Sequence, residues 1–348
     1  MRPTILRAGL KVMESNTRQL SHPYKLNFAV TYRCNSRCKN CGIWRKPLQN
    51  ELSLPEIEKF AKENRFFSWV NLTGGEPFLR NDLYDICLTF SKSADIYLLN
   101  ITTNGFDPSR VARTTEKIAS LGIPRTMVVV SLDGPKKTHE SARGLPGSWD
   151  NALETFRALK ELEKSTKGFK TLLGYTILPE NMGKFAETVR SVRRIVPGTK
   201  TEDFHVNIFH VSPHYYSNSG ERPKESTIKD VINIKKIKSG CPSSMMAVIE
   251  NIYLDLASKF LLDERIPVPC KVLSSSVFLD PTGDVFPCTI YNRRIGNIRE
   301  MRLRDMLVSE RSALHNIDKK CPQCWTPCEA YSAILGNIPR TILKLRGS

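Results

Sequence analysis

The feature that most constrains the fold is a repeated alternation of β-rich apolar runs and amphipathic stretches between residues 25 and about 240. Several runs are nearly continuous in Val, Ile, Leu and Phe, as is typical of parallel strands covered on both faces. Strands are expected at 25–31, 69–73, 96–103, 126–132, 170–178 and 204–211, and helices at 53–65, 81–93, 109–121, 149–165, 181–195 and 226–238. Six successive β-α units predict an α/β fold with a partial (β/α)6 parallel barrel, whose functional loops follow the carboxyl ends of the strands.

After about residue 240 the pattern changes to a small, cysteine-rich region. Residues 275–291 are expected to form a hairpin around the turn Asp280-Pro281-Thr282-Gly283, and a short helix is expected at 302–310. The run CPQCWTPCEAY then occupies residues 321–331. We therefore expect four parts: a basic N-terminal extension at 1–21, the barrel core at 22–240, an α+β cysteine module at 241–335 and a basic C-terminal tail at 336–348.

Charge and hydropathy limit the environment of the chain. The first thirty residues lack a signal peptide, and no window approaches the roughly 18 uncharged apolar residues of a transmembrane helix. These features predict a cytoplasmic location, where cysteines are more often metal ligands or nucleophiles than disulfides. The formal net charge is +17. This charge favours an anionic partner such as a nucleic acid, a phosphorylated substrate or an acidic membrane surface, although a solvated basic surface is an equal alternative.

Three cysteines lie within eight residues directly after the first expected strand. Cys34, Cys38 and Cys41 are separated by three residues and then by two. Three thiolates in one short loop can hold a single inorganic centre and leave one coordination position open. Iron–sulfur clusters are held by such thiolates, whereas structural zinc requires four protein ligands and a closed site.

Together with TGGEP at residues 73–77, the cysteine loop resembles the radical S-adenosylmethionine superfamily. The resemblance implies that Cys34, Cys38 and Cys41 hold a [4Fe–4S] cluster whose fourth iron is chelated by S-adenosylmethionine. It also implies that Gly74, Gly75 and Glu76 contact the methionine amino group. The implied reaction is reductive cleavage of S-adenosylmethionine to a 5′-deoxyadenosyl radical, which abstracts a hydrogen atom from an unidentified substrate. A cellular one-electron reductant, such as ferredoxin or flavodoxin, is implied as a partner.

Further positions match the family in register, with one departure. In similar proteins, Ser131 and Arg143 would bind the ribose and the methionine carboxylate, and Asn104 and Ile177 would line the cofactor cleft. A strand-end turn at Ser131 and a solvated charge at Arg143 are the alternatives. The departure is Asn40, which stands where many members carry an aromatic residue near adenine; Trp44 or Ile43 would have to compensate. No further catalytic residue is assigned.

The second cysteine set resembles the auxiliary-cluster domain called SPASM, or its shorter form, the twitch domain. The full domain carries seven cysteines and two clusters, whereas five cysteines occur here. The resemblance therefore implies one auxiliary [4Fe–4S] cluster on Cys270, Cys288, Cys321 and Cys324, with Cys328 as a competitor for a place. A zinc ribbon is the alternative for this module.

The remaining candidate residues have weaker signals. Cys87 is expected in the core, and Cys241 receives no role. His205 and His210 would lie on opposite faces of the sixth strand, which argues against a shared metal site. Tyr215 and Tyr216 come at the end of the sixth strand, and a place facing the cleft is the less favoured alternative for them. The tail at 337–348 either docks on the core or contacts a membrane surface.

The substrate is not fixed by these patterns. A small molecule, a lipid or a peptide is compatible with the resemblance, and RNA or lipid modification stays open because of the basic charge. The short stretch before the first strand is too small for a compact peptide-binding domain, which weakens a peptide-leader function. The alternative from another class is a non-enzymatic zinc- or Fe–S-binding protein.

Overall fold

The computed structural model describes residues 5–220, 224–240, 242–310 and 321–346. Its centre is a nine-stranded sheet with the order β6-β5-β4-β3-β2-β1-β7-β8-β9. Strands β1 to β6 pair in parallel and form the partial barrel that the sequence predicts. Their bounds are β1 Lys25–Thr31, β2 Trp69–Gly74, β3 Leu98–Thr103, β4 Arg125–Ser131, β5 Phe169–Ile177 and β6 Phe204–Ile208. All six expected strands are confirmed, and the sixth ends at Ile208 rather than at residue 211.

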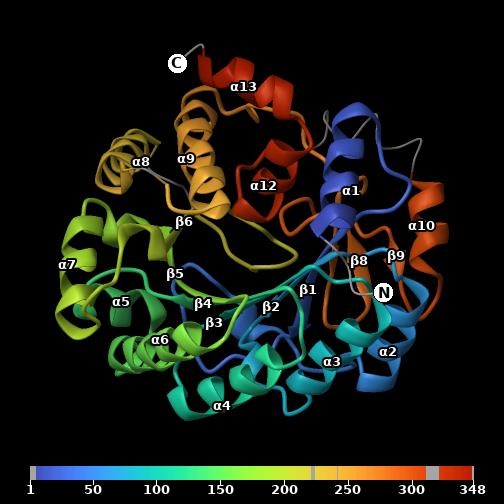
Figure 1. The fold of residues 1–348 in the computed structure, drawn as a ribbon, viewed down its shortest axis with the longest axis horizontal. Coiled ribbons are helices and arrows are strands. Elements are labelled where there is room, and N and C mark those ends of the chain that lie inside the picture. Colours follow the sequence, from blue (N-terminus) through green and yellow to red (C-terminus); the bar gives the residue numbers. More distant parts are fainter. Residues whose placement is uncertain (1–4, 221–223, 241, 311–320, 347–348) are drawn as a thin grey trace.

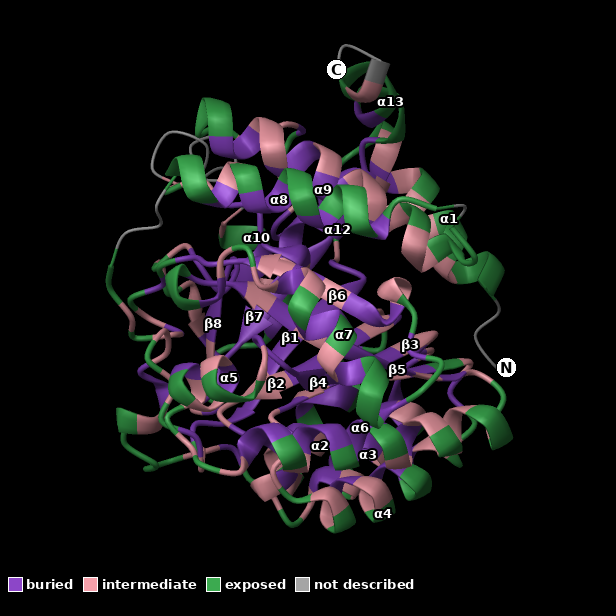
Figure 2. Ribbon diagram, turned by 90° about the vertical axis from the view of Figure 1, so that its left-hand side faces the viewer, coloured by how far each residue is buried: buried purple, intermediate pink, exposed green. Residues whose placement is uncertain are grey.

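The helices between these strands cover the outer side of the curved sheet (Figure 1). Those expected from the sequence are α2 Leu54–Glu63, α3 Leu83–Ser93, α4 Pro108–Ala119, α6 Ser148–Ser165 and α7 Phe185–Ile195. The expected helix α8 (Lys224–Lys238) follows β6 and packs beside α9 (Met245–Asp263) instead (Figure 2). Helix α2 begins with a capping box, in which the Glu56 carboxylate accepts hydrogen bonds from the backbone N–H and the hydroxyl of Ser53. A short additional helix, α5 Lys136–Arg143, precedes α6. The buried strands in Figure 2 form the core against these helices.

The C-terminal region continues the core sheet. Strand β7 (Ser276–Leu279) pairs in parallel with β1, and β8 (Asp284–Phe286) and β9 (Gly296–Asn297) extend the edge as antiparallel strands. The expected hairpin turn is confirmed, because the Asp280 carboxylate accepts hydrogen bonds from the backbone N–H groups of Thr282 and Asp284. The boundary expected after residue 240 stays a prediction, and the sheet itself runs across the two parts.

The other side of the sheet is covered by helices that the sequence did not predict. They are α9 Met245–Asp263, α12 Pro327–Leu335, α13 Ile338–Arg346 and, from the N-terminal segment, α1 Ile5–Thr17. The expected short helix is present as α10 Leu303–Ser309. Helices α9 and α12 pack together through Tyr253 and Tyr331, whose rings meet edge to face with centroids 5.7 Å apart. This cover closes the inner side of the barrel (Figures 1 and 2).

Within the described ranges, none of the helices combines the length and the apolar character that crossing a bilayer requires.

Candidate functional site

A cavity of about 280 Å³ lies inside the curve of the sheet. At one end it is lined by Cys34, Cys38 and Cys41, in the loop that follows β1. At the other end it reaches Lys25 and Trp69, the first residues of β1 and β2. The cavity therefore runs from the carboxyl ends of the strands, where barrel chemistry is usually found, down to their amino ends.

The loop that carries the three cysteines is fixed by backbone hydrogen bonds. The N–H groups of Arg37 and Lys39 donate to the carbonyls of Arg143 and Ala142, at distances of 3.0 and 2.9 Å. These carbonyls are at the C-terminal end of α5, where a helix leaves acceptors without helical partners. The Asn104 amide also donates to Asn35 Oδ1 at 2.7 Å. The loop thus has a defined shape although it has no regular secondary structure.

The glycines after β2 allow this loop to approach closely. The Gly75 N–H donates to the carbonyl of Thr31 at 2.7 Å, and the Glu76 N–H donates to that of Arg33 at 2.8 Å. A Cβ atom built on Gly75 would overlap the Arg33 carbonyl, and Gly74 has a φ of +132°, which favours glycine. Gly74 and Gly75 both line the cavity. The absence of side chains at these two positions lets the two loops pack closely and leaves space for a ligand in the cavity.

Glu76 lies behind the glycines and does not line the cavity. Its carboxylate accepts hydrogen bonds from Asn104 N at 2.6 Å, Thr103 Oγ1 at 2.8 Å and Phe78 N at 3.1 Å. Burial raises the pKa of Glu76 to about 7, although these donors act in the opposite direction. In this structure Glu76 positions Asn104, which does line the cavity.

Arg143 forms a buried ion pair beside the cysteine loop. Its Nη2 lies 2.5 Å from Asp133 Oδ2, and its Nη1 lies 3.9 Å from Cys38 Sγ. Its Nε is buried without a hydrogen-bond partner. Arg143 is therefore not a solvated loop charge, and it keeps an unused N–H donor in a wall of the cavity. That donor suits an anionic ligand group next to the three thiols.

Two other expected cleft residues have different outcomes. Ser131, the last residue of β4, lines the cavity. Ile177 does not; it is buried in the core, and its neighbour Thr176 lines the cavity instead. Successive side chains of a strand point to opposite faces of the sheet, which explains this difference. A role for Ile177 in cofactor binding stays a prediction.

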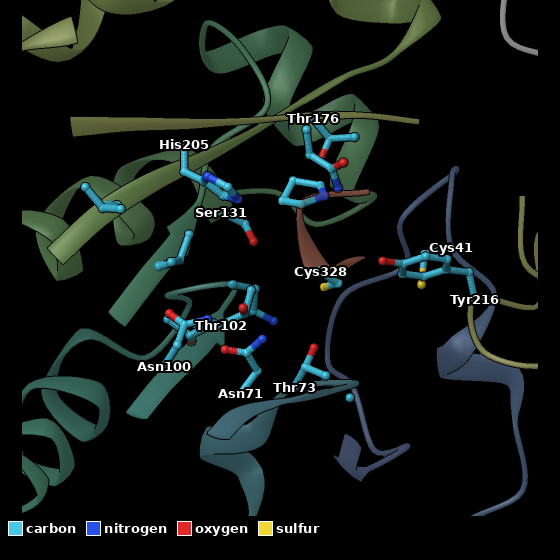
Figure 3. Close-up of a pocket in the computed structure, with 18 of the residues that line it drawn as sticks. Cys41, Asn71, Thr73, Asn100, Thr102, Ser131, Thr176, His205, Tyr216 and Cys328 are labelled. Atoms are coloured by element: carbon cyan, nitrogen blue, oxygen red, sulfur yellow. The ribbon is translucent and has the colours of Figure 1, made fainter. Parts of the chain in front are cut away.

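The C-terminal cysteines divide into a group of four and a separate fifth. The pKa values of Cys270 and Cys288 are raised by burial and further by Cys324, and that of Cys324 by burial and further by Cys321. These four thiols are therefore close neighbours. Cys328 instead lines the main cavity (Figure 3), on the first turn of α12.

The inner strands contribute polar side chains that the sequence analysis missed. Asn71 and Asn100 are register partners on β2 and β3, and both line the cavity with Asn207 of β6 (Figure 3 labels the first two). The Oδ1 atoms of Asn100 and Asn207 are buried without a hydrogen-bond partner. The available signal was an asparagine inside each of three apolar runs, WVNLT, IYLLNITT and FHVNIFHV.

The histidines and tyrosines have separate contacts. His205 lines the cavity with its Nδ1 3.0 Å from Glu250 Oε2, whereas His210 lies beyond β6 and accepts a hydrogen bond from Trp325 N at 2.9 Å. His214 Nε2 is 3.1 Å from the Cys288 carbonyl. Tyr215 and Tyr216 line the cavity, which was the less favoured of their alternatives.

Two cysteines of the sequence belong to neither group. Cys87 is fully buried in the core, as expected. Cys241 lies outside the described residues. Among the described side chains, no three His, Cys, Asp or Glu residues converge to hold a single metal ion. A [4Fe–4S] cube differs in that its cysteines bind separate iron atoms.

Family models match two parts of the chain. The radical SAM superfamily model matches residues 28–192, and an iron–sulfur cluster-binding domain model, SPASM, matches residues 270–329. The first match contains the three-cysteine loop, and the second contains all five C-terminal cysteines.

Similar proteins carry out several reactions. An AdoMet-dependent heme synthase of Methanosarcina barkeri is 23% identical over 306 residues, which cover 82% of each chain. A pre-heme d1 synthase of Dinoroseobacter shibae is 26% identical over 56% of this chain and 44% of its own length. A GTP 3′,8-cyclase of Aliarcobacter butzleri is 30% identical over 60% of this chain, and the match spans 61% of the cyclase.

A solved structure of native anSMEcpe with bound AdoMet and a Kp18Cys peptide has a TM-score of 0.59 at 14% identity. It covers 94% of this chain and 100% of the other. At this identity the likeness establishes the fold.

Proposed function

Because this chain belongs to the radical S-adenosylmethionine superfamily and carries a C-terminal cluster-binding domain, we propose that it abstracts a hydrogen atom from a small substrate inside the barrel. When bound, the [4Fe–4S] cluster and S-adenosylmethionine supply a 5′-deoxyadenosyl radical. The observation that carries the proposal is the single cavity that joins the three thiols to the polar side chains of the inner strands.

At the cluster end, Cys34, Cys38 and Cys41 provide the three thiolates. The unused Nε–H of Arg143 binds a carboxylate of the cofactor, and Ser131 and Asn104 provide further polar contacts at the same rim. Gly74 and Gly75 present backbone atoms to the cofactor amino group. Glu76 acts as a positioning residue, because its carboxylate is already bound to three protein donors.

At the far end, the lining favours a substrate that donates hydrogen bonds and has no net positive charge. Among the described residues that line the cavity, none is acidic, and Lys25 and Arg143 are basic. The unpaired oxygens of Asn100 and Asn207 are acceptors that require N–H or O–H groups from a ligand. These residues determine specificity in the proposed site.

The auxiliary centre is one [4Fe–4S] cluster on Cys270, Cys288, Cys321 and Cys324. Their proximity supports this set, and the position of Cys328 in the cavity wall supports its exclusion. A cluster held by these four cysteines would supply an acceptor for the electron left after hydrogen abstraction. Ferredoxin or flavodoxin as the external reductant, and a cytoplasmic location, stay predictions.

The test begins with anaerobically reconstituted protein, for which we expect about eight irons and eight sulfides per chain. Reduction with S-adenosylmethionine present should release 5′-deoxyadenosine. Deuterated candidate substrates, namely porphyrins, GTP and cysteine-containing peptides, are then screened for deuterium transfer into that product. Protein that binds about eight irons but never releases 5′-deoxyadenosine would contradict the proposal.

Asn100→Leu and Asn207→Leu separate the two ends of the cavity. Both variants should keep basal cleavage of S-adenosylmethionine and lose deuterium transfer, because they remove the acceptors proposed for the substrate. Leu98→Ile, a similar-sized change in the same wall, is the matched control. Loss of basal cleavage in both asparagine variants, with folding retained, would place these residues in cofactor binding instead.

A further inference from the structure

Helix α1 turns apolar side chains toward solvent. Leu6, Leu10 and Met13 are 70%, 61% and 66% exposed, and their spacing of four and three residues places them on one stripe. The opposite side of the helix contacts the protein, where Ser15 is fully buried. A helix that packs on a protein normally turns its apolar stripe inward, so this stripe is without a partner in the described chain.

Helix α13 has the same character. Leu343 is 67% exposed and Ile342 is 45% exposed, whereas Thr341 is buried against the protein. Arg340 and Lys344 are exposed beside them. The segment 337–348 contains three basic residues and no acidic residue. Apolar and basic side chains therefore share the outward surface of this helix.

The two helices are joined directly although they are at opposite ends of the sequence. Asn16 at the end of α1 donates to the Leu335 carbonyl at 2.7 Å and accepts from the Ile338 N–H at 2.6 Å. Lys271 Nζ donates to the Ser15 carbonyl at 2.7 Å. Both helices lie on the side of the molecule away from α2, α3 and α4 (Figures 1 and 2). We call Leu6, Leu10, Met13, Ile342 and Leu343 the terminal-helix surface.

We propose that the terminal-helix surface docks on an anionic phospholipid bilayer. Segments 5–18 and 337–346 contain six basic residues and one acid, Glu14, so their charge complements that of acidic headgroups. The apolar side chains enter the boundary between headgroups and acyl chains, with the helices in the plane of the membrane. A second copy of the chain is a poorer occupant because it would bring like charges together.

The test is co-sedimentation of the anaerobically prepared protein with vesicles. Vesicles made of equal parts of phosphatidylcholine and phosphatidylglycerol should bind the protein. Vesicles of phosphatidylcholine alone should bind at least roughly tenfold less of it. Raising the salt concentration should weaken binding to the anionic vesicles. The measurement needs no substrate and is independent of hydrogen abstraction.

A double variant, Leu6→Glu with Leu10→Glu, should reduce binding to anionic vesicles by roughly tenfold or more, because it removes apolar surface and adds repulsion. Ile195→Glu on α7 is the matched control, since Ile195 is also an exposed apolar side chain on a helix and should be neutral. A second pair, Ile342→Glu with Leu343→Glu, repeats the test on α13.

Three outcomes would overturn the proposal. The protein could fail to bind anionic vesicles, or the control could lose as much binding as the double variants. It could also sediment as a dimer that the double variants convert to a monomer, which would assign the surface to a second copy. Thermal melting confirms that each variant is folded before binding is compared.

Discussion

The two cysteine groups have the same type of side chain in different surroundings. Cys34, Cys38 and Cys41 are partly exposed on a loop at the rim of the cavity. Cys288 and Cys324 are buried, and with Cys270 and Cys321 they lie where the hairpin region meets the segment before α12. The rim group has three thiols and faces the cavity, whereas the second group has four thiols, of which Cys288 and Cys324 are buried and Cys270 and Cys321 are partly exposed. In the proposed sites, the number of thiols and the presence of a neighbouring cavity, rather than the type of ligand, would separate a centre that binds a cofactor from one whose four positions are all taken.

The largest expected effect comes from Cys38→Ala, which removes one ligand from the open group. Release of 5′-deoxyadenosine should fall to background, and iron should fall from about eight to about four per chain, because two thiolates do not retain the cluster. Cys87→Ala is the control, since this buried cysteine belongs to neither group. Continued formation of 5′-deoxyadenosine by Cys38→Ala would show that the rim group does not hold the cluster that cleaves S-adenosylmethionine.

The closed group is tested by two neighbouring serine variants. Cys324→Ser should lose about four irons because it removes one of the four proposed ligands of the second group, whereas Cys328→Ser should retain about eight. Iron analysis with electron paramagnetic resonance of the reduced proteins measures both. The reverse pattern would show that Cys328 is the ligand and that the group of four has been assigned wrongly.

The loop that carries the rim group depends on a close backbone approach at Gly75. Gly75→Ala should destabilise the protein by about 1–3 kcal/mol, because its Cβ overlaps the Arg33 carbonyl and the cysteine loop must shift. Denaturant unfolding measures this effect, and iron analysis should show loss at the rim site first. Gly240→Ala has no atom near its added Cβ and should change stability by less than about 0.5 kcal/mol. Equal effects of the two substitutions would exclude the steric explanation.

The smallest effect concerns pH. The pKa of Glu76 is raised to about 7 in the folded protein, so the folded state binds a proton that the unfolded state has already released. The contribution of Glu76 to stability is therefore present at low pH and is lost as the pH rises through about 7. Between about pH 6 and pH 8 this loss amounts to roughly 1.4 kcal/mol.

Glu76→Gln should remove that part of the pH dependence. Unfolding free energies of the two proteins at both pH values give the comparison, and identical slopes would show that Glu76 does not titrate in this range. The variant should also disturb Asn104, because a glutamine amide cannot accept the Asn104 N–H and the Thr103 hydroxyl as a carboxylate does.

The parallel strands, the helices on the outer side of the barrel and the three-cysteine loop can all be predicted from the sequence. Each is a local pattern: apolar runs report burial, helical periodicity reports amphipathic faces, and the spacing of Cys34, Cys38 and Cys41 keeps three thiols within one loop. The ends of the strands are predicted less well. The apolar run of the sixth expected strand continues to residue 211, whereas β6 ends at Ile208.

The tertiary structure alone decided which way particular side chains face. Cys328 lines the cavity because α12 is fixed by contacts far away in sequence, such as the hydrogen bond from Lys25 Nζ to the Cys328 carbonyl. The Glu76 carboxylate lies behind Gly74 and Gly75, where it accepts a hydrogen bond from Thr103 of β3. Thr176 rather than Ile177 lines the cavity because successive side chains of β5 point to opposite faces of the sheet. The outward direction of the apolar stripe on α1 is likewise set by which side of this helix packs on the protein. These outcomes depend on contacts between distant residues, which no short window of sequence contains.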